Sequence, residues 1–190
     1  MTEYCQRRDL FQKERRYTLS PRCVEWTDSG GECGGFDFAD VERVELKFVP
    51  TRYQRNLHRT VLRGRAKQKL KLTNTHFKGL AAFEDRSAIY VPFLRELHRA
   101  LAAANPSVRY TRGMSHFGYT LTLVLCLIGG VGALFGAYYG LVKDNGWLLF
   151  DCLLLLAVGV LRMWSYLAKN RPGSYDPLEL SDELLPQVKS

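Results

Sequence analysis

The residues best suited to chemistry in this 190-residue chain are a run of cations in its first half. Between Lys47 and Lys71 there are nine lysines and arginines, one histidine, and no aspartate or glutamate. Such side chains bind anions, and each cation held near an anionic membrane surface contributes about 1 kcal/mol. We take eight of them as candidate contacts for lipid or a partner: Arg52, Arg55, Arg59, Arg63, Arg65, Lys67, Lys69 and Lys71.

This basic segment has three interpretations that the sequence leaves open. It contacts anionic lipid head groups, or it docks onto an acidic face of a partner protein. Alternatively, it is a solvated sheet face whose charges discourage edge pairing. Nucleic acid is disfavoured, because the segment has few rings for base stacking, with Tyr53 and His58 the candidates.

Patterns typical of catalytic or metal sites are missing. Nine residues separate Cys23 from Cys33, and no second Cys or His pair follows at zinc-ligand spacing. The glycines near Cys33 lack the Lys-Ser/Thr of a phosphate-binding loop. His98 falls on the polar side of a predicted helix, without a Ser/His/Asp or Cys/His set nearby. We therefore expect a non-enzymatic protein that needs no cofactor and no metal.

Two long apolar runs in the second half of the chain predict that it is anchored in a membrane. The first lacks Lys, Arg, Asp and Glu from Gly113 to Val142, and the second extends from Trp147 to Ala168. As helices, both are long enough to cross a hydrocarbon core of about 30 Å. We predict transmembrane helices at residues 114–142 and 147–168, joined by an extracytoplasmic turn at 143–146.

Flanking charges predict the orientation of this hairpin. The turn has one cation, Lys143, whereas seven lie at or beyond the other helix ends. Cytoplasmic segments carry the excess of Lys and Arg. Both termini are therefore expected in the cytoplasm. The cations at the other ends are Arg95, Arg99, Arg109, Arg112, Arg162, Lys169 and Arg171.

Small and polar residues in the hairpin are candidates for helix packing. The first span carries Gly129, Gly132, Gly136 and Gly140, a spacing that lets another helix backbone come close. That helix is either the second span, another subunit or a second copy of the chain. Asp151 in the second span either hydrogen-bonds Tyr138 or Tyr139, contacts a partner subunit, or handles protons or ions.

The remaining segments are a polar N-terminal arm at residues 1–15, a cytoplasmic domain at 16–112 and a cytoplasmic tail at 169–190. Alternation of apolar and charged residues around Leu46 and Leu70 predicts strands. An apolar stripe through Phe93 and Leu97 predicts a helix that Asn105-Pro106 ends. We therefore predict an α+β membrane protein, whose cytoplasmic domain has several antiparallel strands followed by one helix.

This order resembles the pleckstrin-homology superfold, in the form of the bacterial PH-like domains found beside membrane spans. The resemblance rests on Phe36–Phe48 and on the helix from Ser87 to Ala104, and it covers residues 16–105. It implies a small antiparallel sheet or barrel capped by the helix, in a bacterial inner membrane. Inositide-binding members carry cations around the first hairpin loop. Here that loop is expected at Asp28–Gly35, which has two acids and no Lys or Arg, so inositide binding is not implied.

The tail combines acids with apolar residues. It is either a disordered end or a docking peptide, and free tails gain little from exposed leucine. Its receptor is either the chain's own basic domain or another protein. The candidate docking residues are Tyr175, Leu178, Leu180, Leu184 and Leu185.

Together these features predict a non-enzymatic accessory, assembly or regulatory subunit of a larger membrane complex. Its partners would be other membrane-protein subunits and anionic lipid. A protein that senses anionic lipid is the second hypothesis. An oligomeric channel or transporter that uses Asp151 is the third.

Overall fold

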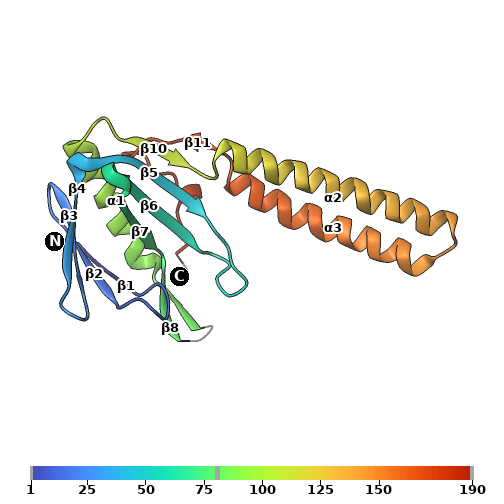
Figure 1. Ribbon diagram of the computed structural model, residues 1–190, viewed down its shortest axis with the longest axis horizontal. Coiled ribbons are helices and arrows are strands. Elements are labelled where there is room, and N and C mark those ends of the chain that lie inside the picture. The colour runs from blue at the N-terminus through green and yellow to red at the C-terminus, as the bar shows by residue number, and fades with distance from the viewer. Residues whose placement is uncertain (1, 80–81, 189–190) are drawn as a thin grey trace. The chain divides into compact units, whose positions relative to one another are not determined.

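The computed structural model describes residues 2–79 and 82–188, with residue 66 described by its backbone alone. The chain divides into two compact units (Figure 1). The first unit combines the residues before Met114 with the segment from Gly173 onward, and the second is Met114–Pro172. The first unit is α+β, and the second consists of two long helices, as the sequence predicts.

Four antiparallel strands in chain order form the first sheet of the α+β unit. Alternate side chains such as Tyr17, Val24 and Phe36 are buried, as expected for a sheet with one face on a core. The alternation of buried and exposed residues along each strand thus gives the sheet one apolar face, which packs on the core. The strands are β1 (Glu3–Gln6), β2 (Arg15–Leu19), β3 (Cys23–Asp28) and β4 (Cys33–Asp37).

The second sheet is mixed. Its centre is an antiparallel meander of β5 (Val41–Phe48), β6 (His58–Gly64) and β7 (Lys69–Thr73). Strand β10 (Arg109–Arg112) lies parallel to β5, and β11 (Gly173–Ser174) pairs antiparallel with β10. The segment after the hairpin therefore completes the edge of this sheet.

Apart from one long helix, short elements make up the rest of the described part of this unit. A separate hairpin consists of β8 (Thr75–Gly79) and β9 (Ala82–Asp85). Three 3₁₀ turns complete the unit: η1 (Phe38–Asp40), η2 (Arg65–Lys67) and η3 (Asp182–Leu184).

Helix α1 (Ser87–Ala104) packs its apolar stripe against both sheets. The stripe residues Phe93, Leu94, Leu97 and Leu101 are all at most 1% exposed and belong to one core with residues of both sheets. Asp85 accepts a hydrogen bond from the backbone N–H of Ser87 at 2.9 Å, which satisfies a donor at the helix start. The helix thus closes the core between the sheets.

Strand β1 lies within the expected N-terminal arm, residues 1–15, so the structure differs from that expectation. Tyr4 is 1% exposed, and its hydroxyl donates a hydrogen bond to the carbonyl of Thr73. The side-chain amide of Gln6 donates to the carbonyl of Lys71 at 2.9 Å, and its oxygen accepts from the Thr73 N–H at 2.8 Å. These contacts come from β7, far along the chain, so no local pattern reveals them.

Because β1 pairs with β2, the first hairpin loop is residues 7–14 and not Asp28–Gly35. This loop contains Arg7, Arg8 and Lys13, and Phe11 at its tip is 93% exposed. The acidic segment Asp28–Gly35 therefore belongs to the third hairpin, β3–β4, and does not describe the charge of the first loop.

The second unit consists of α2 (His116–Val142) and α3 (Gly146–Lys169), which begin and end within two residues of the predicted spans. Both helices are long and apolar enough to cross a membrane, with mean hydropathy values of 2.1 and 1.9. Ser115 Oγ accepts from the Gly118 N–H at 3.1 Å, and Asn145 Oδ1 accepts from the Leu148 N–H at 3.2 Å. Each helix is thereby capped at its N-terminus.

Candidate functional site

The outer face of the second sheet gathers cations from four adjacent strands. Inward-facing neighbours such as Val44, Leu62 and Leu70 lie in the core, so the residues that alternate with them point outward. The outward cations form what we call the basic face: Arg43, Lys47, Arg59, Arg63, Lys69, Lys71 and Arg109.

Four members of the basic face lie in one line across the strands. Arg109 pairs with Arg43, Arg43 with Arg63, and Arg63 with Lys69. Adjacent strands are about 4.8 Å apart, so this cation row extends over about 14 Å. Like charges directly opposite each other destabilise a sheet. The row thus has an electrostatic cost that a bound anion would relieve.

Glu45 is the carboxylate that alternates with Val44 and Leu46 on β5, whereas Glu42 is exposed at the bulge between Val41 and Arg43. Its oxygens accept from Arg63 Nε at 2.6 Å and lie 2.7 Å from Lys47 Nζ. Partial burial opposes ionisation, but the hydrogen bonds from Arg63 and Lys47 hold the pKa of Glu45 below its usual range. Glu45 therefore fixes the positions of two cations.

The other cations of the face stay available to an external anion. Within residues 2–79 and 82–188, no ion pair involves Arg43, Lys69, Lys71 or Arg109. Burial and then the neighbouring cations, Arg8 first among them, lower the pKa of the Lys71 ammonium. The crowding of positive charge that lowers this pKa also attracts anions.

The structure divides the eight predicted contact residues among three places. Arg59, Arg63, Lys69 and Lys71 lie on the basic face, as just described. Arg52 and Arg55 are exposed in the β5–β6 connection, and Arg65 and Lys67 are exposed in η2, the β6–β7 connection.

Three members of the basic face are not among the eight predicted contact residues, although Lys47 is counted in the basic segment. Strand alternation would have found Arg43 and Lys47, because they lie two residues either side of Glu45 on one strand. No local signal could have found Arg109, because it joins the face through the parallel pairing of β10 with β5.

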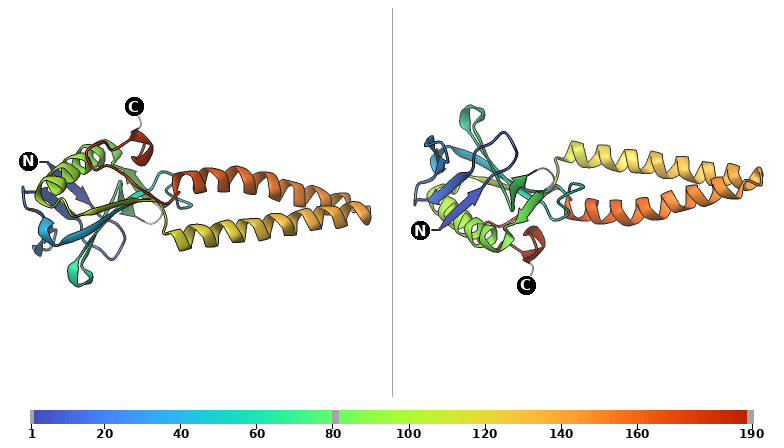
Figure 2. Two further views of the ribbon diagram at one scale, coloured as in Figure 1. Left: turned by 90° about the horizontal axis from the view of Figure 1, so that it is seen from above. Right: turned by 90° about the horizontal axis from the view of Figure 1, so that it is seen from below.

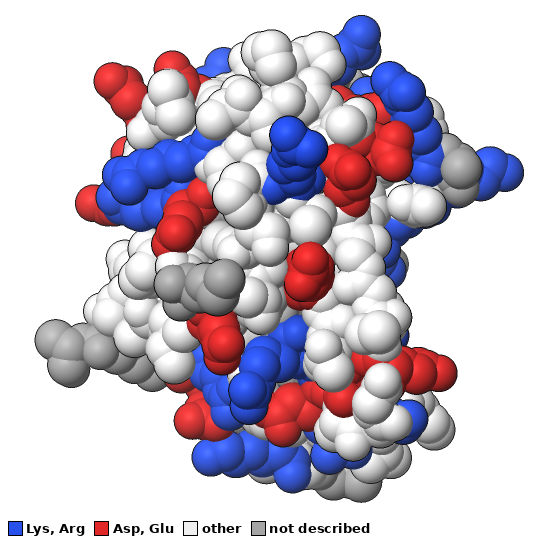
Figure 3. Space-filling view, turned by 90° about the vertical axis from the view of Figure 1, so that its left-hand side faces the viewer, with Lys and Arg blue, Asp and Glu red and all other residues white. Residues whose placement is uncertain are grey.

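Another face of the α+β unit differs in charge. Figure 3 shows Lys and Arg interspersed there with Asp and Glu, without a large area of one sign. Mixed charge of this kind is ordinary for a solvated surface. The basic face is distinguished from it by the near absence of acids.

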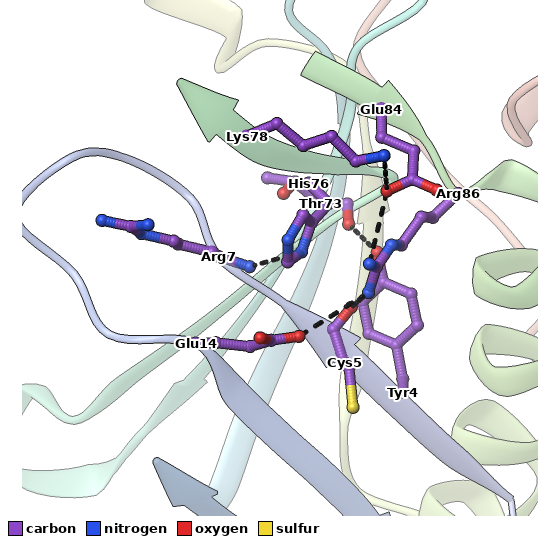
Figure 4. A network of polar contacts seen from close by, with 9 residues as sticks. All are labelled: Tyr4, Cys5, Arg7, Glu14, Thr73, His76, Lys78, Glu84 and Arg86. Atoms are coloured by element: carbon purple, nitrogen blue, oxygen red, sulfur yellow. Dashed lines mark hydrogen bonds and ion pairs between the residues drawn. The ribbon is translucent and has the colours of Figure 1, made fainter. Parts of the chain in front are cut away.

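A cluster of polar side chains around β1 is structural (Figure 4). Arg86 donates to the carbonyl of Cys5 at 2.8 Å and pairs with Glu84 at 3.4 Å, and Lys78 pairs with Glu84 at 3.2 Å. His76 Nδ1 accepts from the backbone N–H of Arg7 at 3.1 Å. These contacts hold β1 against β8 and β9. The described part of the chain contains no group of three or more His, Cys, Asp or Glu able to hold a metal ion.

The predicted glycine stripe of α2 divides into two halves. A Cβ added at Gly136 would lie 2.7 Å from Cys152 Sγ, and one at Gly140 would lie 2.9 Å from the backbone nitrogen of Leu149. These two glycines therefore pack against α3. A Cβ at Gly129 or Gly132 would meet nothing within 4 Å.

The two helices are closest near their turn and separate away from it (Figure 2). The separation leaves an apolar groove of about 370 Å³ within the hairpin. Its lining includes Gly129, Gly130 and Ala133 of α2 and Leu155, Gly159 and Met163 of α3.

Asp151 is exposed on α3, and no hydrogen bond or ion pair reaches it from the described residues. The hydrogen bond with Tyr138 or Tyr139 that the sequence suggested is therefore not present, and both tyrosines are largely exposed. An unpartnered carboxylate on an apolar helix is costly in a membrane, which makes Asp151 a candidate contact for another subunit.

The structure places the tail against the α+β unit. Leu180 and Leu185 are 8% and 4% exposed within the core, and Tyr175 and Leu184 pack against it. Leu178 differs from the other predicted docking residues, because it is 64% exposed. Between the two receptors that the sequence left open, the structure shows the tail on the chain's own domain.

The prediction that His98 lies on the polar side of its helix is wrong. His98 is 1% exposed, because the rings of Tyr110 and Tyr175 cover it at centroid distances of 5.8 and 5.7 Å. Both tyrosines come from segments that the helical pattern does not include, β10 and the tail.

Comparison with known proteins identifies no relative of this chain. No protein-family model, curated protein or solved structure matches the chain.

Proposed function

We propose that this chain is a non-enzymatic accessory subunit of a larger membrane complex. Its hairpin anchors it among other membrane-protein subunits, and its basic face holds an acidic surface of one of them. The single observation that carries the proposal is the basic face itself, seven cations on four adjacent strands, of which Glu45 pairs with two.

The hairpin supports this proposal from within the membrane. The groove at Gly129 and Gly130 is open, and small residues let a partner helix approach closely. Asp151 offers that partner a polar contact. The tail, by contrast, packs into the chain's own core, so we assign it no external partner.

The fold and the location are parts of the same proposal. Two successive antiparallel meanders, β1–β4 and β5–β7, precede helix α1, an order that favours a variant of the pleckstrin-homology superfold. The β8–β9 hairpin and the parallel strand β10 are departures from that pattern. The excess of flanking cations favours both termini in the cytoplasm. A bacterial inner membrane is what the resemblance to bacterial PH-like domains implies.

Purification of the full chain from its native membrane in mild detergent tests the proposal. We expect a membrane protein to co-purify in fixed stoichiometry. Charge reversal at Lys69 and Lys71, both exposed on β7, should remove it, whereas reversal at Arg22, exposed between β2 and β3, should not. A chain that purifies alone, or a partner that survives the reversal on β7, contradicts the proposal.

Contact with anionic lipid is the second candidate, and the first hairpin loop favours it. Asp9 Oδ1 accepts from the N–H groups of Phe11 and Gln12 at 3.0 Å each, and Arg7 donates to the carbonyl of Leu10 at 3.1 Å. The loop is thus held in a shape that exposes Leu10 and Phe11. Apolar tips with basic neighbours suit the boundary of an anionic bilayer.

Replacement of Phe11 by Trp tests this alternative. In vesicles containing anionic lipid, brominated lipid should quench the added tryptophan more than in neutral vesicles. Leu178→Trp, at an exposed tail position, is the control. Equal quenching of both variants in both kinds of vesicle excludes insertion of the loop.

A further inference from the structure

One end of the basic face is hollowed into a cleft of about 550 Å³. Three members of the cation row, Arg43, Arg63 and Arg109, line it together with Arg65 of η2. Polar residues Asn105 and Ser107 form another part of the wall. The volume lies within the range of about 300–1,000 Å³ typical of small-molecule sites.

Much of the wall is fixed before any ligand arrives. The side-chain amide of Asn105 donates to the carbonyls of Phe38 and Val41 at 2.9 and 3.1 Å, and its oxygen accepts from Ser107 Oγ at 2.6 Å. Arg63 is held by Glu45. Binding would therefore order only Arg43, Arg65 and Arg109, which limits its entropic cost.

The charge of the lining selects the class of ligand. Four arginines and one acid, Glu42, give it a formal charge of +3. A phosphate monoester carries about −1.5 to −2 at neutral pH, so two phosphoryl groups match this charge better than one. The planar guanidinium group presents paired N–H donors that fit phosphoryl oxygens.

We propose that this cleft binds a small molecule with two phosphoryl groups. Arg43 and Arg109 on adjacent strands hold one group, and Arg65 with the free N–H groups of Arg63 holds the other. Glu42 faces the same cleft and disfavours a third phosphoryl group. The ligand is either a soluble diphosphate or the head group of a lipid diphosphate, which present the same chemistry. The site goes beyond the accessory role and does not depend on it.

Isothermal titration calorimetry of the full chain in phosphatidylcholine nanodiscs tests the site. Pyrophosphate and ADP should bind once per chain and at least tenfold more tightly than inorganic phosphate. Arg43→Ala and Arg109→Ala should each weaken this binding at least tenfold. Arg22→Ala removes an exposed arginine elsewhere and should leave it unchanged. Circular dichroism checks that every variant is folded.

A second arm separates the two sources of ligand. Nanodiscs containing farnesyl diphosphate should raise the thermal unfolding midpoint of the parent chain but not of Arg43→Ala. Binding of the soluble probes supports a soluble ligand, and a response to the lipid alone supports a head group. The proposal is overturned if neither the soluble probes nor the lipid gives a response. It is also overturned if Arg22→Ala weakens the binding of the probes as much as Arg43→Ala does. Because the chain is tested without a partner, this failure would leave the co-purification result unaffected.

Discussion

The hydroxyl of Tyr175 donates a hydrogen bond to Nε2 of His98 at 2.8 Å, and so ties the tail to helix α1. The other ring nitrogen, Nδ1, lies 2.8 Å from the carbonyl of Leu94. Because a carbonyl only accepts, Nδ1 carries a proton, and in the neutral ring Nε2 is the acceptor for Tyr175. Burial lowers the pKa of His98 to about 4.

This pKa predicts a loss of stability in mild acid. Between about pH 6.5 and 4 the unfolded chain binds a proton at His98 that the folded chain does not. As the pH is lowered through that window, the free energy of unfolding should therefore decrease, by about 3 kcal/mol in total. His98→Gln should remove most of this slope in denaturant titrations, whereas His116→Gln, at an exposed position, should keep it. An unchanged slope in His98→Gln contradicts the assignment.

The tail should contribute to the stability of the domain it covers. Leu180→Ala and Leu185→Ala each remove a side chain from the core and should lower the free energy of unfolding by about 2–4 kcal/mol. Leu178→Ala, at a 64% exposed position, should change it by less than about 0.5 kcal/mol. Chemical denaturation of the detergent-solubilised chain measures all three. Equal effects would mean that the tail does not pack as described.

The two halves of the glycine stripe should respond differently to alanine. At Gly140 the added Cβ meets the backbone of α3, which cannot move aside cheaply, and we expect a loss of about 1–3 kcal/mol. At Gly132 the Cβ meets nothing within 4 Å, so the hairpin should tolerate it. Thermal unfolding followed by helical circular dichroism compares the two variants. A partner that is lost only with Gly132→Ala would identify the open half as its contact.

Lys67 adopts a backbone conformation with φ of 63°, which costs a residue with a Cβ about 1–2 kcal/mol. Glycine avoids this cost but loses more chain entropy on folding. We therefore expect Lys67→Gly to raise the free energy of unfolding by about 0.5–1 kcal/mol. Lys69→Gly, within β7, should instead lower it by about 0.5–1 kcal/mol in the same denaturation experiment. Destabilisation by both variants contradicts the turn geometry.

Several features could be predicted from the sequence because they depend on neighbouring residues alone. The two long apolar helices follow from uninterrupted hydropathy, and their ends follow from the charged and capping residues beside them. The stripe of α1 follows from helical spacing. The concentration of cations between Lys47 and Lys71 is visible by counting.

Only the tertiary structure decided how distant segments combine. Arg109 joins Arg43 because β10 pairs in parallel with β5, and Tyr4 becomes a core residue because β7 supplies its partner. The burial of His98 depends on Tyr175, which lies beyond the whole hairpin. Periodicity reports which face of an element is apolar, whereas pairing between strands and the docking of a tail depend on long-range packing free energy. The sequence therefore indicated a membrane hairpin and a basic domain, and the fold placed the cations in a row beside a cleft.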